Sequence, residues 1–119
     1  SDQSRRDSYQ KMKDVLANGM HMCIYPEGTR NKTGKPLKEF HDGAFKLSLD
    51  TGKSIMPCII FGTKRMLPND RKFYFRPGRL EMHFLDPVAA LPGETVQQLK
   101  DRVFGIMWAY YEAREKDFR

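Results

Sequence analysis

Hydrophobic residues recur at helical spacing in the first part of the chain, between residues 6 and 18. The apolar positions of this stripe are Tyr9, Met12, Val15 and Leu16. Residues three or four apart share one face of a helix, so the spacing predicts an amphipathic helix that ends at Gly19. Residues 20–25 then form a short, nearly continuous apolar run, which indicates a buried parallel strand.

A second helix and strand are predicted after a polar loop over residues 26–40. Apolar positions over residues 42–51 favour a helix, and Gly52 marks its end. Residues 55–61 form another apolar run. Pro57 within it has no N–H to donate, so we expect this strand to be bulged or partly unpaired.

The last third of the chain alternates first at the period of a strand and then at the period of a helix. Over residues 79–85, Leu80, Met82 and Phe84 share one face, which predicts a strand with that face buried. A long helix begins near Thr95, with Gln98 placed for a capping box. The apolar stripe of that helix is Val96, Leu99, Val103, Met107 and Tyr110.

Helices that alternate with short apolar strands predict an α/β fold with a mostly parallel central sheet and flanking helices. The 119 residues leave room for one domain, and no repeat or linker divides residues 1–119. No apolar stretch approaches the ~20 residues that span a bilayer. Cys23 and Cys58 lie in apolar runs, so we expect both to be reduced core residues.

Basic residues outnumber acidic ones by 21 to 15, which gives a net charge of +6. This excess favours anionic partners, with a solvated basic face as the alternative. The most basic segment, residues 64–79, surrounds the aromatic residues Phe73, Tyr74 and Phe75. It suits an anionic membrane, the phosphates of CoA, an acidic carrier protein, or a solvated hairpin. A nucleic-acid site is not favoured, because no recognition motif accompanies the charge.

A run of six residues, Tyr25-Pro-Glu-Gly-Thr-Arg30, follows the first predicted strand and is suited to holding a phosphate. Gly28 allows close backbone approach, Thr29 offers a hydroxyl, and Arg30 can pair bidentately with phosphate oxygens. Glu27 would orient Arg30 or accept a substrate hydroxyl. The alternative is a plain turn with a salt bridge between Glu27 and Arg30.

These six residues resemble the substrate-binding motif of the glycerolipid acyltransferases. The similarity extends in order over residues 5–61, through Gly43-Ala-Phe-Lys46 and Ile55-Met-Pro-Cys-Ile-Ile60. The 1-acylglycerol-3-phosphate acyltransferases are the nearest group. The resemblance implies that Glu27, Gly28, Thr29 and Arg30 form part of the acceptor site, with Arg30 on the phosphate.

The resemblance also implies an activity, partners and a location. A fatty acyl group would pass from acyl-CoA or acyl carrier protein to the sn-2 hydroxyl of lysophosphatidic acid, with no metal or other cofactor. The parent enzyme would work at the cytoplasmic face of a membrane. Two alternatives stay open: an acyltransferase for another acceptor, glycerol 3-phosphate or an aminolipid, and a non-enzymatic basic module for anionic lipid or nucleic acid.

The catalytic motif of that family, a His followed after four residues by an Asp, is absent. The fifth residue after His21, His41 and His83 is Pro26, Lys46 and Val88, respectively. His41 and Asp42, and His83 and Asp86, have the wrong spacing and indicate a helix cap or an exposed strand residue. We therefore expect residues 1–119 to be the carboxyl-terminal part of an acyltransferase domain, inactive without a general base.

Overall fold

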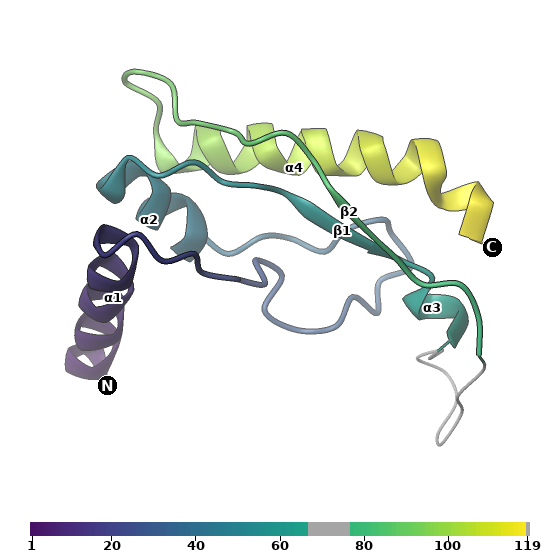
Figure 1. Cartoon of the computed structure of the whole chain (residues 1–119), viewed down its shortest axis with the longest axis horizontal. Coiled ribbons are helices and arrows are strands. Elements are labelled where there is room, and N and C mark those ends of the chain that lie inside the picture. Colours follow the sequence, from purple (N-terminus) through teal and green to yellow (C-terminus); the bar gives the residue numbers. More distant parts are fainter. Residues whose placement is uncertain (67–76, 119) are drawn as a thin grey trace.

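The structure is a computed structural model that describes residues 1–66 and 77–118. Most of the basic segment over residues 64–79, with its three aromatic residues, lies outside the described residues. The elements are α1 (Asp2–Ala17), α2 (Gly43–Thr51), β1 (Cys58–Phe61), α3 (Thr63–Met66), β2 (Glu81–Phe84), α4 (Val96–Arg114) and the 3-10 helix η1 (Glu115–Phe118). In Figure 1, α4 runs along one side of the β1–β2 ribbon, and α1 lies at the end away from α3.

Local capping signals fix the ends of the helices, and three of these predictions are confirmed. The helix α1 ends before Gly19, and α2 stops at Gly52, whose φ of 71° lies in the left-handed region. At the start of α4, the backbone N–H of Gln98 donates to Thr95 Oγ1 at 3.1 Å. The Thr95 N–H donates to Gln98 Oε1 at 2.9 Å, which completes the capping box.

The sheet differs from the predicted one, because β1 and β2 pair antiparallel, with Cys58 opposite Phe84 and Phe61 opposite Glu81. The prediction of a mostly parallel central sheet is therefore wrong for the part of the chain that the structure describes. An antiparallel pair needs no crossover helix between its strands, whereas a parallel pair usually has one. The interruption expected at Pro57 is present, since the ladder continues beyond it only as an isolated bridge between Ile55 and Val88.

Residues 20–25 form no regular structure, so the prediction of a strand there is wrong. No strand within residues 1–66 and 77–118 pairs with this segment, so its apolar side chains stay accessible; Tyr25 is 75% exposed. Cys23 is exposed as well, which corrects its placement in the core. Cys58 is half-buried, and this burial raises the pKa of its thiol. Both thiols are free.

The strand β2 has the alternation that the sequence predicts, but with its faces reversed. The side chains of Glu81 and His83 turn inward, whereas Met82 and Phe84 are 56% and 65% exposed. The inward face packs against aromatic rings, with the His83 ring 4.9 Å from that of Phe61. His83 can occupy this position because both of its ring nitrogens have hydrogen-bond partners there.

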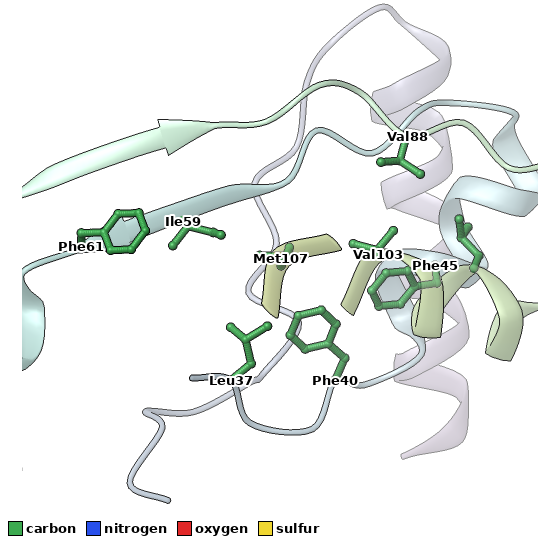
Figure 2. Close-up of a cluster of buried hydrophobic side chains, with 9 residues drawn as sticks. Leu37, Phe40, Phe45, Ile59, Phe61, Val88, Val103 and Met107 are labelled. Atoms are coloured by element: carbon green, nitrogen blue, oxygen red, sulfur yellow. The ribbon is translucent and has the colours of Figure 1, made fainter. Parts of the chain in front are cut away.

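The hydrophobic core lies between the inner face of the sheet and α4. Its buried residues are Leu37, Phe40, Phe45, Ile59, Phe61, Val88, Leu99, Val103 and Met107. Figure 2 shows Leu37 and Phe40 reaching from the loop between α1 and α2 toward Met107 and Val103. The loop that carries the six-residue motif is thus part of the core packing.

Charged side chains tie the segment before α4 to that helix. The guanidinium of Arg102 pairs with both carboxylate oxygens of Glu94 at 2.8 and 2.9 Å and also donates to the Ala89 carbonyl at 2.7 Å. Glu94 further accepts the backbone N–H of Leu91 at 3.0 Å. The hydrogen bond from Arg102 is the main cause that lowers the pKa of Glu94.

We expect replacement of Leu99 by alanine to destabilise the fold. Leu99 is 0% exposed, and removal of a buried leucine side chain costs about 3 kcal/mol of unfolding free energy, since it leaves a cavity. Ile106→Ala on the same helix is the matched control, because that side chain is 39% exposed and its loss should cost less than about 1 kcal/mol. Urea denaturation of both variants measures the difference. Equal costs would place Leu99 outside the core.

We expect Glu94→Gln to lower the melting temperature at pH 7 and to matter less in acid. The pKa of Glu94 is lower in the folded chain than its ordinary value of 4.5. Its stabilising effect is therefore complete above about pH 4.5 and disappears as the pH falls through the folded-state pKa. Thermal melts from pH 3 to 7 test this. Asp86→Asn is the control, because Asp86 is exposed. A temperature difference that stays constant over this range would contradict the assignment.

Candidate functional site

The six-residue motif begins with a tight turn. The backbone N–H of Gly28 donates to the Tyr25 carbonyl at 3.0 Å, and Gly28 has a φ of 72°. This left-handed conformation favours glycine, and a Cβ added there would lie 3.0 Å from the ring of His41. The His41 N–H donates to the Pro26 carbonyl at 2.8 Å, so the two ends of the loop are joined.

Glu27 stabilises the interior of this loop. Its Oε2 accepts the backbone N–H of Lys38 at 2.8 Å, and the Lys38 ammonium donates to the Glu27 carbonyl at 3.3 Å and to Thr29 Oγ1. No ion pair joins Glu27 to Arg30 in the described structure, so the alternative of a surface salt bridge is wrong. Glu27 holds the loop through Lys38 instead.

A second group of hydrogen bonds shapes the tip of the loop. The side chain of Asn31 donates to the Lys35 carbonyl at 2.7 Å and accepts from both the N–H and the hydroxyl of Thr33, at 2.9 and 2.6 Å. Short polar side chains often form such local bonds in turns. They keep the tip folded back, so that basic side chains on either side of it face one hollow.

The polar loop is held to the rest of the molecule by two apolar side chains. Leu37 and Phe40 are 7% and 3% exposed. The ring of Phe40 stacks on Phe45 of α2 with centroids 5.9 Å apart and meets Phe104 of α4 edge-on at 4.9 Å. The site is therefore attached to both helices that flank the core.

The loop surrounds an open hollow of about 430 Å³ lined by Thr29, Arg30, Lys32, Thr33 and Lys38. The lining contains three cations and two hydroxyls, and no carboxylate. No hydrogen bond or ion pair engages the Arg30 guanidinium in the described part of the chain, so it is available for a ligand. Arg, Lys and Thr donors around one space are what a phosphate group requires.

The hollow includes two of the four predicted acceptor residues, Thr29 and Arg30. Gly28 shapes the turn beside it, and Glu27 acts through Lys38. The sequence analysis missed three lining residues, which are Lys32, Thr33 and Lys38. The signal was present in the spacing of lysines 32, 35 and 38, which repeats through the loop that follows the motif.

The three histidines have different surroundings. His21 is exposed, and His41 lies beside the motif at Gly28. Asp42 stands at the N-cap of α2, but its carboxylate pairs with Lys100 at 2.7 Å and does not cap the helix. His83 is not the exposed strand residue that we expected, because Nδ1 lies 2.6 Å from the Tyr110 hydroxyl and Nε2 lies 2.9 Å from a Glu81 carboxylate oxygen.

Within residues 1–66 and 77–118, no cluster of three His, Cys, Asp or Glu side chains is arranged to hold a metal ion. Among the helices of the same residues, none is long and apolar enough to cross a bilayer.

The described residues form helices packed on a small antiparallel sheet, and the loop with the basic hollow is a candidate phosphate-binding site. A profile of the acyltransferase family matches residues 1–61, which include the whole loop, and the chain belongs to this family. The family predicted from the motif is thereby confirmed.

Relatives with assigned names agree with this family. A 1-acyl-sn-glycerol-3-phosphate acyltransferase of Chlamydomonas reinhardtii is 30% identical over 92 residues, which are 77% of this chain and 27% of the relative. The alpha enzyme of that name from Mus musculus is 30% identical over 91 residues, 75% of this chain and 32% of the relative. The chain thus spans about a third or less of the length of these relatives.

A solved structure has the same fold over most of the chain. The 1-acyl-sn-glycerophosphate acyltransferase PlsC from Thermotoga maritima superposes with a TM-score of 0.76 and 26% identity, covering 88% of this chain and 43% of that one. The arrangement of loop, helices and sheet described above is therefore that of an acyltransferase.

We expect Glu27→Gln to loosen the loop even though Glu27 does not line the hollow. The change removes the negative charge that strengthens the bond to the Lys38 N–H, and loss of that charge weakens such a bond by about 1 kcal/mol. Amide hydrogen exchange at Lys38, followed by NMR, should then become several-fold faster. Glu39→Gln, an exposed carboxylate in the same loop, is the matched control. Equal exchange rates in wild type and Glu27→Gln would show that the carboxylate does not hold the loop.

Proposed function

We propose that this chain forms part of a 1-acylglycerol-3-phosphate acyltransferase. In the reaction, the sn-2 hydroxyl of lysophosphatidic acid attacks the carbonyl carbon of an acyl thioester. The C–S bond breaks, the thiol leaves, and the hydroxyl proton passes through a general base to the thiolate. The products are phosphatidic acid and the free thiol carrier.

The observation that carries this proposal is the hollow at Thr29 and Arg30, lined by three cations and no carboxylate, in the part of the chain that the acyltransferase profile matches. We assign the phosphate of the acceptor to this hollow. Arg30 supplies a planar pair of donors, Lys32 and Lys38 add charge, and the Thr29 hydroxyl completes the set.

Binding of the acceptor phosphate and removal of the hydroxyl proton require different groups. None of the three histidines precedes an Asp at the family spacing, so the general base is not identified among these residues. His41 is the histidine beside the motif, and its ring borders Gly28. An imidazole nitrogen can accept the proton of an attacking hydroxyl, which makes His41 the residue to replace if the chain alone transfers acyl groups.

The location of the enzyme and the identity of the acyl donor follow from the proposed substrates. Lysophosphatidic acid is a membrane lipid, so the whole enzyme would work at a membrane surface, which we place on the cytoplasmic side. The donor would be acyl-CoA or acyl carrier protein. Glycerol 3-phosphate carries the same phosphate group and is the alternative acceptor.

We expect Arg30→Gln to weaken binding of lysophosphatidic acid and of glycerol 3-phosphate about tenfold, since a charge-assisted contact of 1.5–3 kcal/mol is about one to two powers of ten. Isothermal titration calorimetry with short-chain lysophosphatidic acid measures this. Lys53→Gln removes an exposed charge outside the hollow and should leave binding unchanged. Equal loss in both variants would mean non-specific attraction to the net charge and would reject the site.

Acyl transfer itself is measured with labelled acyl-CoA and lysophosphatidic acid. This chain is compared with a longer polypeptide in which a segment carrying the His and Asp motif precedes residue 1. Activity in the longer form alone supports the proposal. Activity in this chain that disappears in His41→Gln would make His41 the base. If neither form transfers an acyl group to lysophosphatidic acid but one transfers it to glycerol 3-phosphate, the acceptor would be glycerol 3-phosphate.

A further inference from the structure

Residues 20–25 have the composition of a buried strand, but the described structure leaves most of their side chains uncovered. The run reads Met-His-Met-Cys-Ile-Tyr, and Met20, Ile24 and Tyr25 are 59%, 36% and 75% exposed. His21 and Cys23 are exposed as well, so both faces of the run are accessible. Nearly continuous apolar runs are typical of strands that are buried on both faces, and grouped exposed apolar side chains mark a contact site.

The backbone of this run is also unpaired. Within residues 1–66 and 77–118, no backbone–backbone hydrogen bond involves residues 21–24. The ends of the run, by contrast, are fixed. The Met20 N–H donates to the Val15 carbonyl at 3.3 Å, and the Tyr25 carbonyl accepts from the Gly28 N–H at 3.0 Å. A segment that is held at both ends thus presents an unused row of N–H and C=O groups to a further strand.

This run leads from α1 directly into the loop that carries the cationic hollow (Figure 1). The hydrogen bond of 2.8 Å from the His41 N–H to the Pro26 carbonyl holds the end of the run against that loop. Neighbouring strands lie about 4.7–4.9 Å apart. One end of a strand paired with residues 21–24 would therefore lie close to the loop with Thr29 and Arg30, where a general base needs to be.

The comparisons indicate where such a strand would come from. The superposition on PlsC leaves more than half of PlsC without a counterpart in this chain, and the two named relatives are matched over about a third or less of their length. The general base of the proposed reaction is not identified among residues 1–119. One further segment of the same polypeptide would supply both the base and the pairing partner.

A second copy of this chain fits the run less well. Each copy has a net charge of +6, so two copies repel each other. Pairing between two copies would also bring no group that the chain lacks, and the general base would still have to come from elsewhere.

We propose that a further strand of the acyltransferase polypeptide, outside residues 1–119, pairs with residues 21–24 and carries the general base to the hollow at Thr29 and Arg30. The pairing satisfies the backbone groups of residues 21–24 and buries Cys23 and Ile24. The role of the strand in proton transfer rests on the proposed function. The pairing itself rests on the unpaired backbone and the exposed apolar side chains.

Amide hydrogen exchange at residues 21–24, followed by NMR, tests the pairing. It is measured in this chain and in the longer polypeptide described above, in which a segment carrying the His and Asp motif precedes residue 1. In this chain the four amides should exchange about as fast as those of an unstructured peptide. In the longer polypeptide at least two of them should exchange about a hundredfold more slowly, because a paired amide exchanges only when the pairing opens.

Substitutions at Ile24 separate pairing from the stability of the chain. Because Ile24 is 36% exposed, Ile24→Asp should leave the melting temperature of this chain unchanged, but it should remove the slow exchange in the longer polypeptide. Ile106→Asp introduces the same charge on α4, at a position that is 39% exposed, and should preserve the slow exchange. Ile24→Val keeps an apolar side chain and should preserve it too.

Other outcomes overturn the proposal. Equally fast exchange at residues 21–24 in both polypeptides would reject the pairing. Slow exchange in this chain alone would also reject it, and slowing that grows with protein concentration would identify a second copy as the partner. Acyl transfer by the longer polypeptide without slow exchange would reject the pairing and keep the proposed function. Slow exchange without transfer to lysophosphatidic acid or glycerol 3-phosphate would keep the pairing and reject the proposed function.

Discussion

The insertion of Leu37 and Phe40 into the core is the constraint on which the rest of the structure depends. A polar loop with many lysines repels itself and has little reason to adopt one shape. These two apolar side chains attach it to α2 and α4 through burial and ring contacts. With the end of the loop fixed, Glu27 accepts a hydrogen bond from the Lys38 N–H and the Asn31 side chain donates to the Lys35 carbonyl, and these bonds shape the remainder. The cationic hollow is thus a product of hydrophobic packing.

Features of the fold that depend on neighbouring residues could be predicted from the sequence. The capping box at Thr95 and the left-handed stop at Gly52 each depend on a few adjacent positions. Pairing partners and burial depend on distant residues. The run over residues 20–25 has strand character but no pairing partner in the described structure, and β2 turns His83 inward because Tyr110 and Glu81 satisfy its nitrogens.

In the candidate site, too, local features could be predicted from the sequence and contacts between distant residues could not. Gly28, Thr29 and Arg30 were identified because their chemistry and order are local to one motif. The role of Glu27 was not, since its partner is the backbone of Lys38, eleven positions along the chain. Lys38 itself enters the hollow only because the loop closes at Pro26 and His41. A contact made by loop closure leaves no periodic pattern in the sequence.

The reversed faces of β2 affect how the molecule behaves toward itself. With the polar residues of β2 turned inward, the strands and the residues that flank them expose apolar side chains. These are Met56, Ile60, Leu80, Met82 and Phe84, each at least 36% exposed. Ile60 and Met82 lie opposite each other in the ladder, and exposed apolar side chains that lie side by side promote self-association. The net charge of +6 provides the opposing repulsion, which acts over about one Debye length. The colloidal stability of the chain therefore depends on ionic strength, and salt brings the apolar faces together.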